Sequence, residues 1–443
     1  MKKGRIGFVS ISHEDYINDI VLEQTALAQR NIEELGFEVV AAEELVTDHG
    51  SAYRAGTRIA CSEVDGVVLF LASWVECAYF MSVLREVEHL PLCLQCFPMC
   101  LKNGVEESTG SFVAYAMLQG TLNRVGYQYL SIMTALELPE TKRETEVFCT
   151  AATAFSRLKR ARVGLVGYTS MSIYPGTFDH VFMRTKVGPE IEQFDTYSLI
   201  RIAEEKTEAE KRTVIQKYRD NATIHREVPE EYLLKSAGLY LGLKELCGDR
   251  GLEAINVKCQ YELSKEYKMV PCVPLSLIAE DGIVASCEGD ILNTVSMLIL
   301  HYLSGETVTY GDCMSQKGQV VKFSSCGFNP FSMGVKGEQL IRNFMPHPGF
   351  TGIECSFVIH PGRVTLMRLV EDQCSYHILY FTGEGLPTEL RQGYMPALDV
   401  RLDGDVNELI KRFSGQHYAI CFGDLSEKIE AVAKILNIPA IRV

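Results

Sequence analysis

The sequence predicts an α/β protein in which two Rossmann-like parallel-sheet domains precede a C-terminal, β-rich α+β domain. Three observations support this class. Short apolar runs alternate with helical periods over most of the chain, and strand-like segments separated by Gly and Pro turns follow residue 304. A chain of 443 residues with 47% hydrophobic content also exceeds one ordinary core. We expect domains at residues 1–158, 159–282 and 283–443.

Strands and helices alternate throughout the first domain. The expected helices span residues 17–35 and 76–86. The expected strands lie at residues 5–10, 38–42, 65–71 and 90–95. Because parallel strands are joined by helical crossovers, this order predicts a parallel sheet covered on both faces.

The second domain repeats this pattern after a charged helix at residues 140–160. It opens with a strand at residues 162–168 and continues through polar helices at residues 207–220 and 229–247. A strand at residues 253–258 follows. The order again indicates an α/β unit.

The C-terminal domain begins with a strand at residues 283–286 and a helix at residues 291–303. Antiparallel strands are expected next, at residues 319–325, 351–359, 363–371 and 376–382. The chain then returns to an α/β pattern, with helices at residues 406–413 and 426–436, a strand at 418–422 and a last extended segment at 440–443.

Composition narrows the class of partner and compartment. A net charge of -14 argues against nucleic acid, which requires a basic surface. The 15 cysteines are odd in number and often lie in apolar contexts, which indicates reduced thiols in a cytoplasm. The N-terminal residues lack the apolar core of a signal peptide. No apolar run approaches the roughly 18 residues of a membrane helix, so we expect a cytoplasmic protein without a membrane partner.

Two carboxylates stand at the strand–helix junction SCEGDILN, residues 286–293. Asp290 is expected to cap the following helix, and Gly305 to end it. An N-cap is one sufficient explanation for Asp290. Glu288 is harder to explain, because charges are rarely buried without a partner. Two carboxylates at the carboxyl end of a strand favour a cation such as Mn²⁺ or Mg²⁺.

Other polar residues stand at comparable positions. Gln260 and Glu262 follow the strand at residues 253–258, and Asp312 follows a short apolar stretch. His417 precedes a buried strand, where a histidine is often structural; as a ligand it would favour Mn²⁺ or another transition ion. The chain contains no phosphate loop of the Walker type, no dinucleotide fingerprint and no nucleophile elbow. The cysteines of CLQC, residues 93–96, lack the second ligand pair of a zinc site.

At these residues the sequence resembles the L-fucose isomerase and L-arabinose isomerase superfamily, and more closely its short L-fucose isomerase-like proteins. Four stretches carry the resemblance: RVGLVGYTSMSIYPGTFD (162–179), VASCEGDILNTVSMLILHYLSG (284–305), SGQHYAICFGD (414–424) and LASWVECAYF (71–80). The resemblance spans nearly the full length of the chain.

This resemblance implies a metal-dependent aldose–ketose isomerase acting on L-fucose, D-arabinose or a related sugar. It implies that Asp290 and His417 bind a catalytic Mn²⁺ or another divalent cation, and that Trp74 contacts the sugar. It also implies a homo-oligomer, a trimer or hexamer, in which the first domain of a neighbouring subunit closes over the substrate. We add Gln260 as a candidate substrate-binding residue.

One departure leaves the third metal ligand and the base open. The family carries a glutamate upstream of the acidic junction, whereas the stretch MVPCVP, residues 269–274, has no acid. Glu262 or Glu288 would fill this role, with Asp312 and the soft ligand Cys272 as further candidates for the metal. We therefore expect Asp290, His417 and Glu262 as ligands, and Glu288 or Glu262 as the base beside Asp290 in the catalytic set.

Two alternatives remain. The substrate could be a modified anionic aldose such as sulfoquinovose, which would require basic side chains near its far end; Arg54, Arg58 and Lys102 are candidates. A protein of another class, a non-catalytic sugar-binding protein, would also consist of consecutive α/β domains. Sugar binding without metal-dependent turnover would identify it.

Overall fold

The computed structural model describes residues 3–373, 375–390 and 392–443. The chain divides into two compact units. Unit 1 comprises Met1–Arg157 and Glu427–Asn437, and unit 2 comprises Leu158–Ser426 and Ile438–Val443. Among the described residues, no helix combines the length and the hydropathy needed to cross a membrane.

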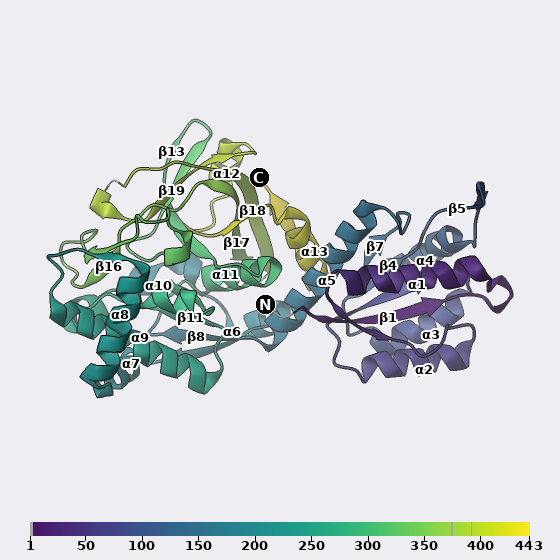
Figure 1. Cartoon of the computed structure of the whole chain (residues 1–443), viewed down its shortest axis with the longest axis horizontal. Helices are drawn as coiled ribbons and strands as arrows, with labels where there is room; N and C mark the ends of the chain where they lie inside the picture. Colours follow the sequence, from purple (N-terminus) through teal and green to yellow (C-terminus); the bar gives the residue numbers. More distant parts are fainter. Residues whose placement is uncertain (1–2, 374, 391) are drawn as a thin grey trace. The chain divides into compact units, whose positions relative to one another are not determined.

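Unit 1 contains a five-stranded parallel sheet with the order β2-β1-β3-β4-β7. Helices lie on both sides of this sheet (Figure 1). Its strands are β1 (Arg5–Ile11), β2 (Glu38–Ala41), β3 (Gly66–Leu71), β4 (Leu92–Gln95) and β7 (Leu130–Ile132). Its helices are α1 (Asp19–Glu34), α2 (His49–Ala60), α3 (Cys77–Val87), α4 (Ser111–Val125), α5 (Pro139–Arg160, which runs into unit 2) and α13 (Ser426–Leu436). A small hairpin, β5 (Cys100–Lys102) and β6 (Val105–Glu107), completes the unit.

The two faces of this sheet fill two separate cores. Phe8 and Phe70 belong to one core, and their neighbours Val9 and Leu69 belong to the other. Side chains of a strand alternate between faces, so a strand buried on both sides must be apolar throughout. This explains the uninterrupted apolar runs at β1 and β3.

Unit 2 contains a four-stranded parallel sheet with the order β12-β11-β8-β9. Its strands are β8 (Arg162–Val166), β9 (Glu190–Phe194), β11 (Ala254–Val257) and β12 (Val284–Cys287). Its helices include α6 (His180–Phe182), α7 (Thr196–Glu205), α8 (Glu208–Asn221), α9 (Glu230–Arg250), α10 (Cys272–Glu280) and α11 (Ile291–Ser304). A three-stranded sheet accompanies them: β10 (Thr223–Ile224), β15 (Leu340–Asn343) and β16 (Ile353–Cys355).

The remaining described strands of unit 2 form a closed antiparallel ring, except β21, which pairs with β18 in parallel. The sheet has the order β17-β20-β13-β14-β19-β18-β21, and an additional pairing of β17 with β18 closes it. The strands are β13 (Thr309–Lys317), β14 (Val320–Ser324), β17 (Gly362–Asp372), β18 (Ser375–Leu386), β19 (Ala397–Leu402), β20 (His417–Phe422) and β21 (Ala440–Arg442). Helix α12 (Val406–Lys411) connects β19 to β20. The apolar core of the ring includes Phe323, Leu398 and Tyr418.

The predicted α/β class, with two parallel sheets and a β-rich part, is confirmed. The structure differs in detail. Asp312 lies in β13, within a strand that was not among the expected ones, and has a cross-strand partner there. Strand β12 pairs with β11 although the expected domain boundary precedes it, and α13 belongs to unit 1. The separation of unit 2 at residue 283 stays a prediction.

Candidate functional site

A polar pair stands on the outer face of the ring in unit 2. His417 opens β20 and lies directly opposite Asp312 of β13 in the strand register. Tyr418, the next residue, points into the apolar core of the ring. Because side chains alternate along a strand, His417 and Asp312 face outward. They contact the turn between β12 and α11, which carries Glu288 and Asp290.

This turn has an unusual backbone. Glu288 and Gly289 have positive φ angles of 71° and 72°. A Cβ atom on Gly289 would lie 2.5 Å from the carbonyl oxygen of Tyr168, so glycine is required there. The buried side chain of Asn256 accepts a hydrogen bond from the Gly289 backbone N–H at 2.7 Å and donates to the Cys287 carbonyl at 3.1 Å. A non-glycine residue with positive φ is held by its surroundings, and here it directs a carboxylate toward His417.

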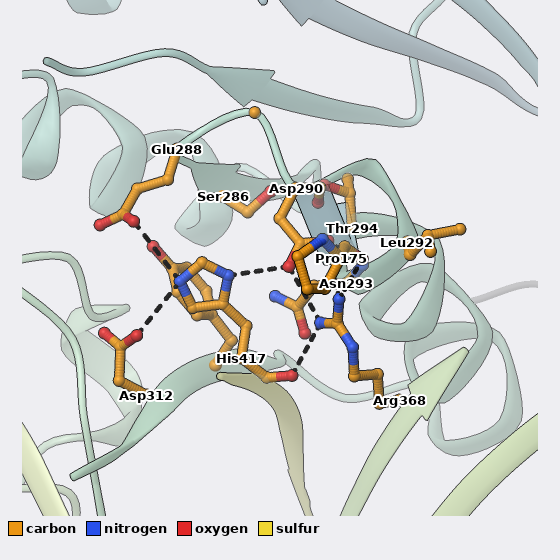
Figure 2. A network of polar contacts seen from close by, with 12 residues as sticks. Pro175, Ser286, Glu288, Asp290, Leu292, Asn293, Thr294, Asp312, Arg368 and His417 are labelled. Atoms are coloured by element: carbon orange, nitrogen blue, oxygen red, sulfur yellow. Dashed lines mark hydrogen bonds and ion pairs between the residues drawn. The ribbon is translucent and has the colours of Figure 1, made fainter. Parts of the chain in front are cut away.

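Figure 2 shows the cluster that results, in which His417 lies between three carboxylates. Its Nδ1 lies 2.9 Å from Asp290 Oδ2. Its Nε2 lies 3.3 Å from Asp312 Oδ1 and 3.6 Å from Glu288 Oε2. The histidine is fully buried, and Nε2 has no hydrogen-bond partner. An unsatisfied buried nitrogen between two carboxylates is a position where a cation would replace the missing contact.

A buried arginine that the sequence analysis missed completes the cluster. Arg368 of β17 is fully buried, and its Nη1 donates to Asp290 Oδ2 and to the His417 carbonyl oxygen, both at 2.9 Å. Its Nη2 donates to the Pro175 carbonyl at 2.6 Å. The signal in the sequence was an arginine inside the apolar strand VTLMRLV, residues 364–370, because a buried charge needs a partner.

The charges of the cluster shift one another. Burial opposes ionisation of Asp290, yet Arg368 and His417 hold its pKa well below the usual range. Burial also opposes the charged form of His417, but its hydrogen bond to Asp290 and the nearby carboxylates of Glu288 and Asp312 raise its pKa well above the usual value. Burial and the neighbouring carboxylates raise the pKa of Asp312 to about 6, although His417 opposes this. The cluster therefore favours positive charge at His417, which a proton on the imidazole or a cation beside Nε2 would supply.

The contacts of Asp290 favour a role other than the expected one. Besides Arg368 and His417, its Oδ1 accepts the Asn293 backbone N–H at 2.9 Å, which confirms the predicted N-cap of α11. The side chain is 1% exposed. Protein donors thus occupy both oxygens, and the direct contact with His417 leaves no space for a cation between the two. Such a carboxylate orients a metal-binding imidazole from behind.

The donors around Nε2 do fit a divalent cation. An imidazole nitrogen with two carboxylate oxygens suits Mn²⁺ or a similar ion. Among the described residues, only Cys259, Cys287 and Glu288 place three potential ligand atoms within 4.8 Å of one another. Glu288 and Asp312 must therefore approach each other for one ion to bind both carboxylates and His417.

Glu262 and Gln260 lie beyond the end of β11, with partners of their own. Glu262 is bound by the buried ammonium group of Lys258, and Tyr168 donates to its Oε1 at 3.2 Å. Burial alone would raise the pKa of Glu262, but Lys258 lowers it below the usual value. The Ser170 hydroxyl donates to the buried Gln260 side chain. The backbone N–H of Ser170 donates to the Glu288 carbonyl at 2.9 Å. The roles expected for Glu262 and Gln260 remain predictions.

Of the two other candidates, Cys272 lies near Cys287 and Glu288, whereas Trp74 lies in unit 1. Cys272 is buried at the start of α10. Trp74 follows β3 in unit 1, where its ring lies 5.7 Å from His13 and 6.3 Å from Tyr16. The basic candidates of unit 1 are paired with carboxylates: Arg54 with Glu44, Arg58 with Glu43 and Lys102 with Asp19. A contact of Trp74 with sugar therefore stays a prediction.

A cavity of about 690 Å³ borders the strand that carries Asp312. In the strand register, Asp312 lies opposite Ser324 of β14, and Ser324 lies opposite Ala397 of β19. Both partners line the cavity, together with Lys322. The register partners His417, Asp312, Ser324 and Ala397 thus lie side by side on one face of the sheet, and the last two border a cavity of a size that binds small ligands.

Fold and site together define an α/β protein with a buried carboxylate–imidazole cluster at strand ends. No family model matches the chain. Curated relatives named sulfoquinovose isomerase are similar to it: 23% identical over 301 residues for Alkalicoccus urumqiensis, and 28% over 218 residues for Priestia aryabhattai. These matches cover 65% and 47% of this chain, and 66% and 48% of the relatives. The matched region thus spans about half to two thirds of the length of these relatives.

Proposed function

We propose that this protein is a metal-dependent aldose–ketose isomerase whose substrate is a sulfonated aldose of the sulfoquinovose type. The observation that carries the proposal is Nε2 of His417, which has no hydrogen-bond partner but faces the carboxylates of Glu288 and Asp312. The names of the similar proteins supply the reaction and the substrate class. They support the anionic-aldose alternative over the expected L-fucose or D-arabinose, and an enzyme over a non-catalytic sugar-binding protein.

The residues around Nε2 would hold the cation. His417, Glu288 and Asp312 are the ligands in this proposal, while Asp290 and Arg368 fix the imidazole from the opposite side. A bound Mn²⁺ would neutralise negative charge that develops on the sugar oxygens O1 and O2. Asp290 thereby changes from the expected ligand to a positioning residue.

Proton transfer is assigned to Glu262. The reaction moves the C2 proton of the aldose to C1 and the O2 proton to O1, so one carboxylate takes and returns the carbon-bound proton. Lys258 holds Glu262 ionised. The Glu262 side chain is 41% exposed and thus accessible to a sugar. Glu288 remains the alternative base, because it stands in the same cluster as His417.

Isotope exchange tests the activity. We expect purified protein with Mn²⁺ in D₂O to convert sulfoquinovose into its ketose and to place deuterium on the carbon that receives the proton, as read by NMR. L-fucose and D-arabinose serve as comparison sugars. Sulfoquinovose binding without ketose or deuterium incorporation would support the sugar-binding protein instead.

Variants of two carboxylates separate their roles. Glu262→Gln should abolish deuterium incorporation while Mn²⁺ binding, measured by calorimetry, is retained. Glu288→Gln should lose both properties. Glu266→Gln, an exposed carboxylate on the same helical turn (Glu262–Glu266), is the matched control and should behave as the unmodified protein. Full exchange activity in Glu262→Gln would transfer the base role to Glu288.

A further inference from the structure

A second group of potential metal ligands stands beside the proposed cation site. Cys287 is the last residue of β12, and Cys259 follows the neighbouring strand β11 by two residues. Val257 and Cys287 are register partners, so both thiols emerge at the same edge of the parallel sheet. Their sulfur atoms and a carboxylate oxygen of Glu288 all lie within 4.8 Å of one another.

The distances are close to those of a bound ion. Ligands around a tetrahedral Zn²⁺, with Zn–S of about 2.3 Å and Zn–O of about 2.1 Å, lie roughly 3.6 to 3.8 Å apart. The three atoms therefore need to approach one another by no more than about 1.2 Å. All three residues are buried, at 8% exposure for Cys259, 4% for Cys287 and 8% for Glu288. The backbone segments that bear these side chains, two strand ends and a constrained turn, are held in place by the sheet.

Further sulfur and nitrogen donors surround this group. The Cys326 thiol lies 3.8 Å from Glu288 Oε1 and 3.6 Å from His347 Nε2. The Tyr310 hydroxyl lies 2.9 Å from the Cys287 sulfur. Thiolate ligands select Zn²⁺ and similar soft ions, whereas the oxygen-rich side at His417 suits Mn²⁺. The two sides of Glu288 thus differ in the ions that they prefer.

We propose that Cys259, Cys287 and Glu288 form a binding site for a thiophilic divalent cation such as Zn²⁺, separate from the oxygen-rich site but sharing Glu288 with it. Binding forms two metal–sulfur bonds and one metal–oxygen bond, and the two thiol protons pass to the solvent. Because a carboxylate engaged by this ion turns away from His417, a thiophilic ion is expected to inhibit a reaction that needs Glu288. The binding itself does not depend on the proposed isomerase activity.

The test is a titration of the full chain with Cd²⁺, a spectroscopic stand-in for Zn²⁺, under reducing conditions and without sugar or Mn²⁺. We expect an ultraviolet sulfur-to-cadmium charge-transfer band that saturates at one ion per chain. Cys259→Ala and Cys287→Ala should each weaken this binding by at least about 100-fold, beyond the effect of changing an indirect neighbour. The matched control is Cys93→Ala, a fully buried thiol of unit 1, which should leave the band unchanged.

Several outcomes overturn the site. Absence of a saturable band in the unmodified chain would overturn the site without any variant. Equal affinity for Cd²⁺ in the unmodified chain and in both cysteine variants would also overturn it. If an alanine variant fails to fold, as judged by circular dichroism, Cys259→Ser and Cys287→Ser replace it and must still weaken binding.

If isomerase activity is present, a second readout follows. Zn²⁺ should inhibit Mn²⁺-dependent turnover in the unmodified protein and much less in Cys259→Ala. Failure of the isomerase proposal would remove this readout but not the cadmium titration, so the two proposals fail separately.

Discussion

Arg368 shows how much of the candidate site depends on one residue. It neutralises Asp290, fixes the backbone of His417 and lies 78 residues from the first and 49 from the second in sequence. Asp290 in turn fixes the imidazole. A buried charge that loses its partner is costly, whereas an exposed ion pair contributes little. Stability and site geometry are therefore coupled at this residue.

Replacing Arg368 should accordingly cost stability. We expect Arg368→Met to lower the free energy of unfolding by about 3–5 kcal/mol, because it removes the guanidinium that pairs with the buried carboxylate of Asp290. Urea denaturation followed by circular dichroism measures this. The matched control is Arg363→Met on the same strand, where the arginine pairs with Asp403 and Asp424 at the surface; about 1 kcal/mol or less is expected. Equal losses in the two variants would contradict the role of Arg368.

Glu354 of β16 is a buried acid with a different consequence. It is fully buried, neither carboxylate oxygen has a hydrogen-bond partner, and burial raises its pKa to about 9 against the opposing charge of Arg342. The folded chain therefore keeps a proton that the unfolded chain loses near its ordinary pKa of about 4.5. The stability that this group contributes is present at low pH and is lost as the pH rises toward 9.

The pH dependence of stability should reveal this proton. Glu354→Gln should flatten the fall in unfolding free energy between pH 5 and pH 8, by up to about 1.4 kcal/mol per pH unit. Urea denaturation at several pH values measures the slope. Glu338→Gln, at an exposed glutamate of the same region, should keep the slope of the unmodified protein. Parallel profiles for Glu354→Gln and the unmodified protein would show that Glu354 is ionised in the fold.

At the scale of elements, helix α11 connects the site to the core. Asp290 caps its start, and Gly305 ends it with φ of 79°. The two glycines that flank the helix differ in their surroundings. Gly289 has no room for a Cβ atom, whereas nothing lies within 4 Å of one built on Gly305. Both glycines have positive φ, so replacing either one carries the conformational cost of that backbone region. Only at Gly289 does a side chain add a steric conflict.

This difference predicts unequal effects of alanine. Gly305→Ala should cost about 1 kcal/mol, the ordinary penalty of the left-handed conformation. Gly289→Ala should cost about 1–3 kcal/mol more, because the backbone of Tyr168 must move, and it should weaken Mn²⁺ binding by displacing Glu288. Thermal denaturation and calorimetry measure the two effects. A Gly305→Ala variant as damaging as Gly289→Ala would argue against the constrained turn.

At the scale of the whole molecule, the chain enters unit 1 twice. Residues 427–437, with most of α13, belong to unit 1, although the strands before and after this helix pair within the ring of unit 2. Lys428 of α13 pairs with Glu146 of α5, and Ile435 packs against the core that contains Phe8. The stability of unit 1 thus depends on a segment near the end of the sequence.

Hydrogen exchange can locate this dependence. Ile429→Ala, at a fully buried position of α13, should lower the protection of the unit 1 strands β1 and β3 by an amount equivalent to about 2–5 kcal/mol. Protection in β17 and β20 should change less. Ile410→Ala, at an exposed isoleucine of α12, is the control and should change neither. A loss of protection centred on β17 and β20 would contradict the assignment of α13 to unit 1.

The expected homo-oligomer and cytoplasmic location also belong to this scale and stay proposals. A neighbouring subunit that supplies Trp74 would explain why this residue lies in unit 1 while the cluster at His417 lies in unit 2. Light scattering of the purified chain would report a trimer or hexamer.

The sequence by itself determined many of the elements and both ends of α11. Apolar periodicity is a local property, so it predicted the buried strands β1 and β3, the antiparallel region after residue 304, and helix α11 with Asp290 as its cap and Gly305 as its stop. It also selected Glu288 as a carboxylate that needs a partner. These properties follow from neighbouring residues alone.

Only the tertiary structure decided which of these residues meet. His417 and Asp290 are 127 residues apart, and the register that sets Asp312 opposite His417 depends on how two strands align in a closed ring. Arg368 pairs with the carboxylate of Asp290, and for this reason we propose a positioning role for Asp290 in place of the expected ligand role. Partner choice across such separations is decided by strand register and burial, because a buried charge takes whichever opposite charge the fold brings within reach.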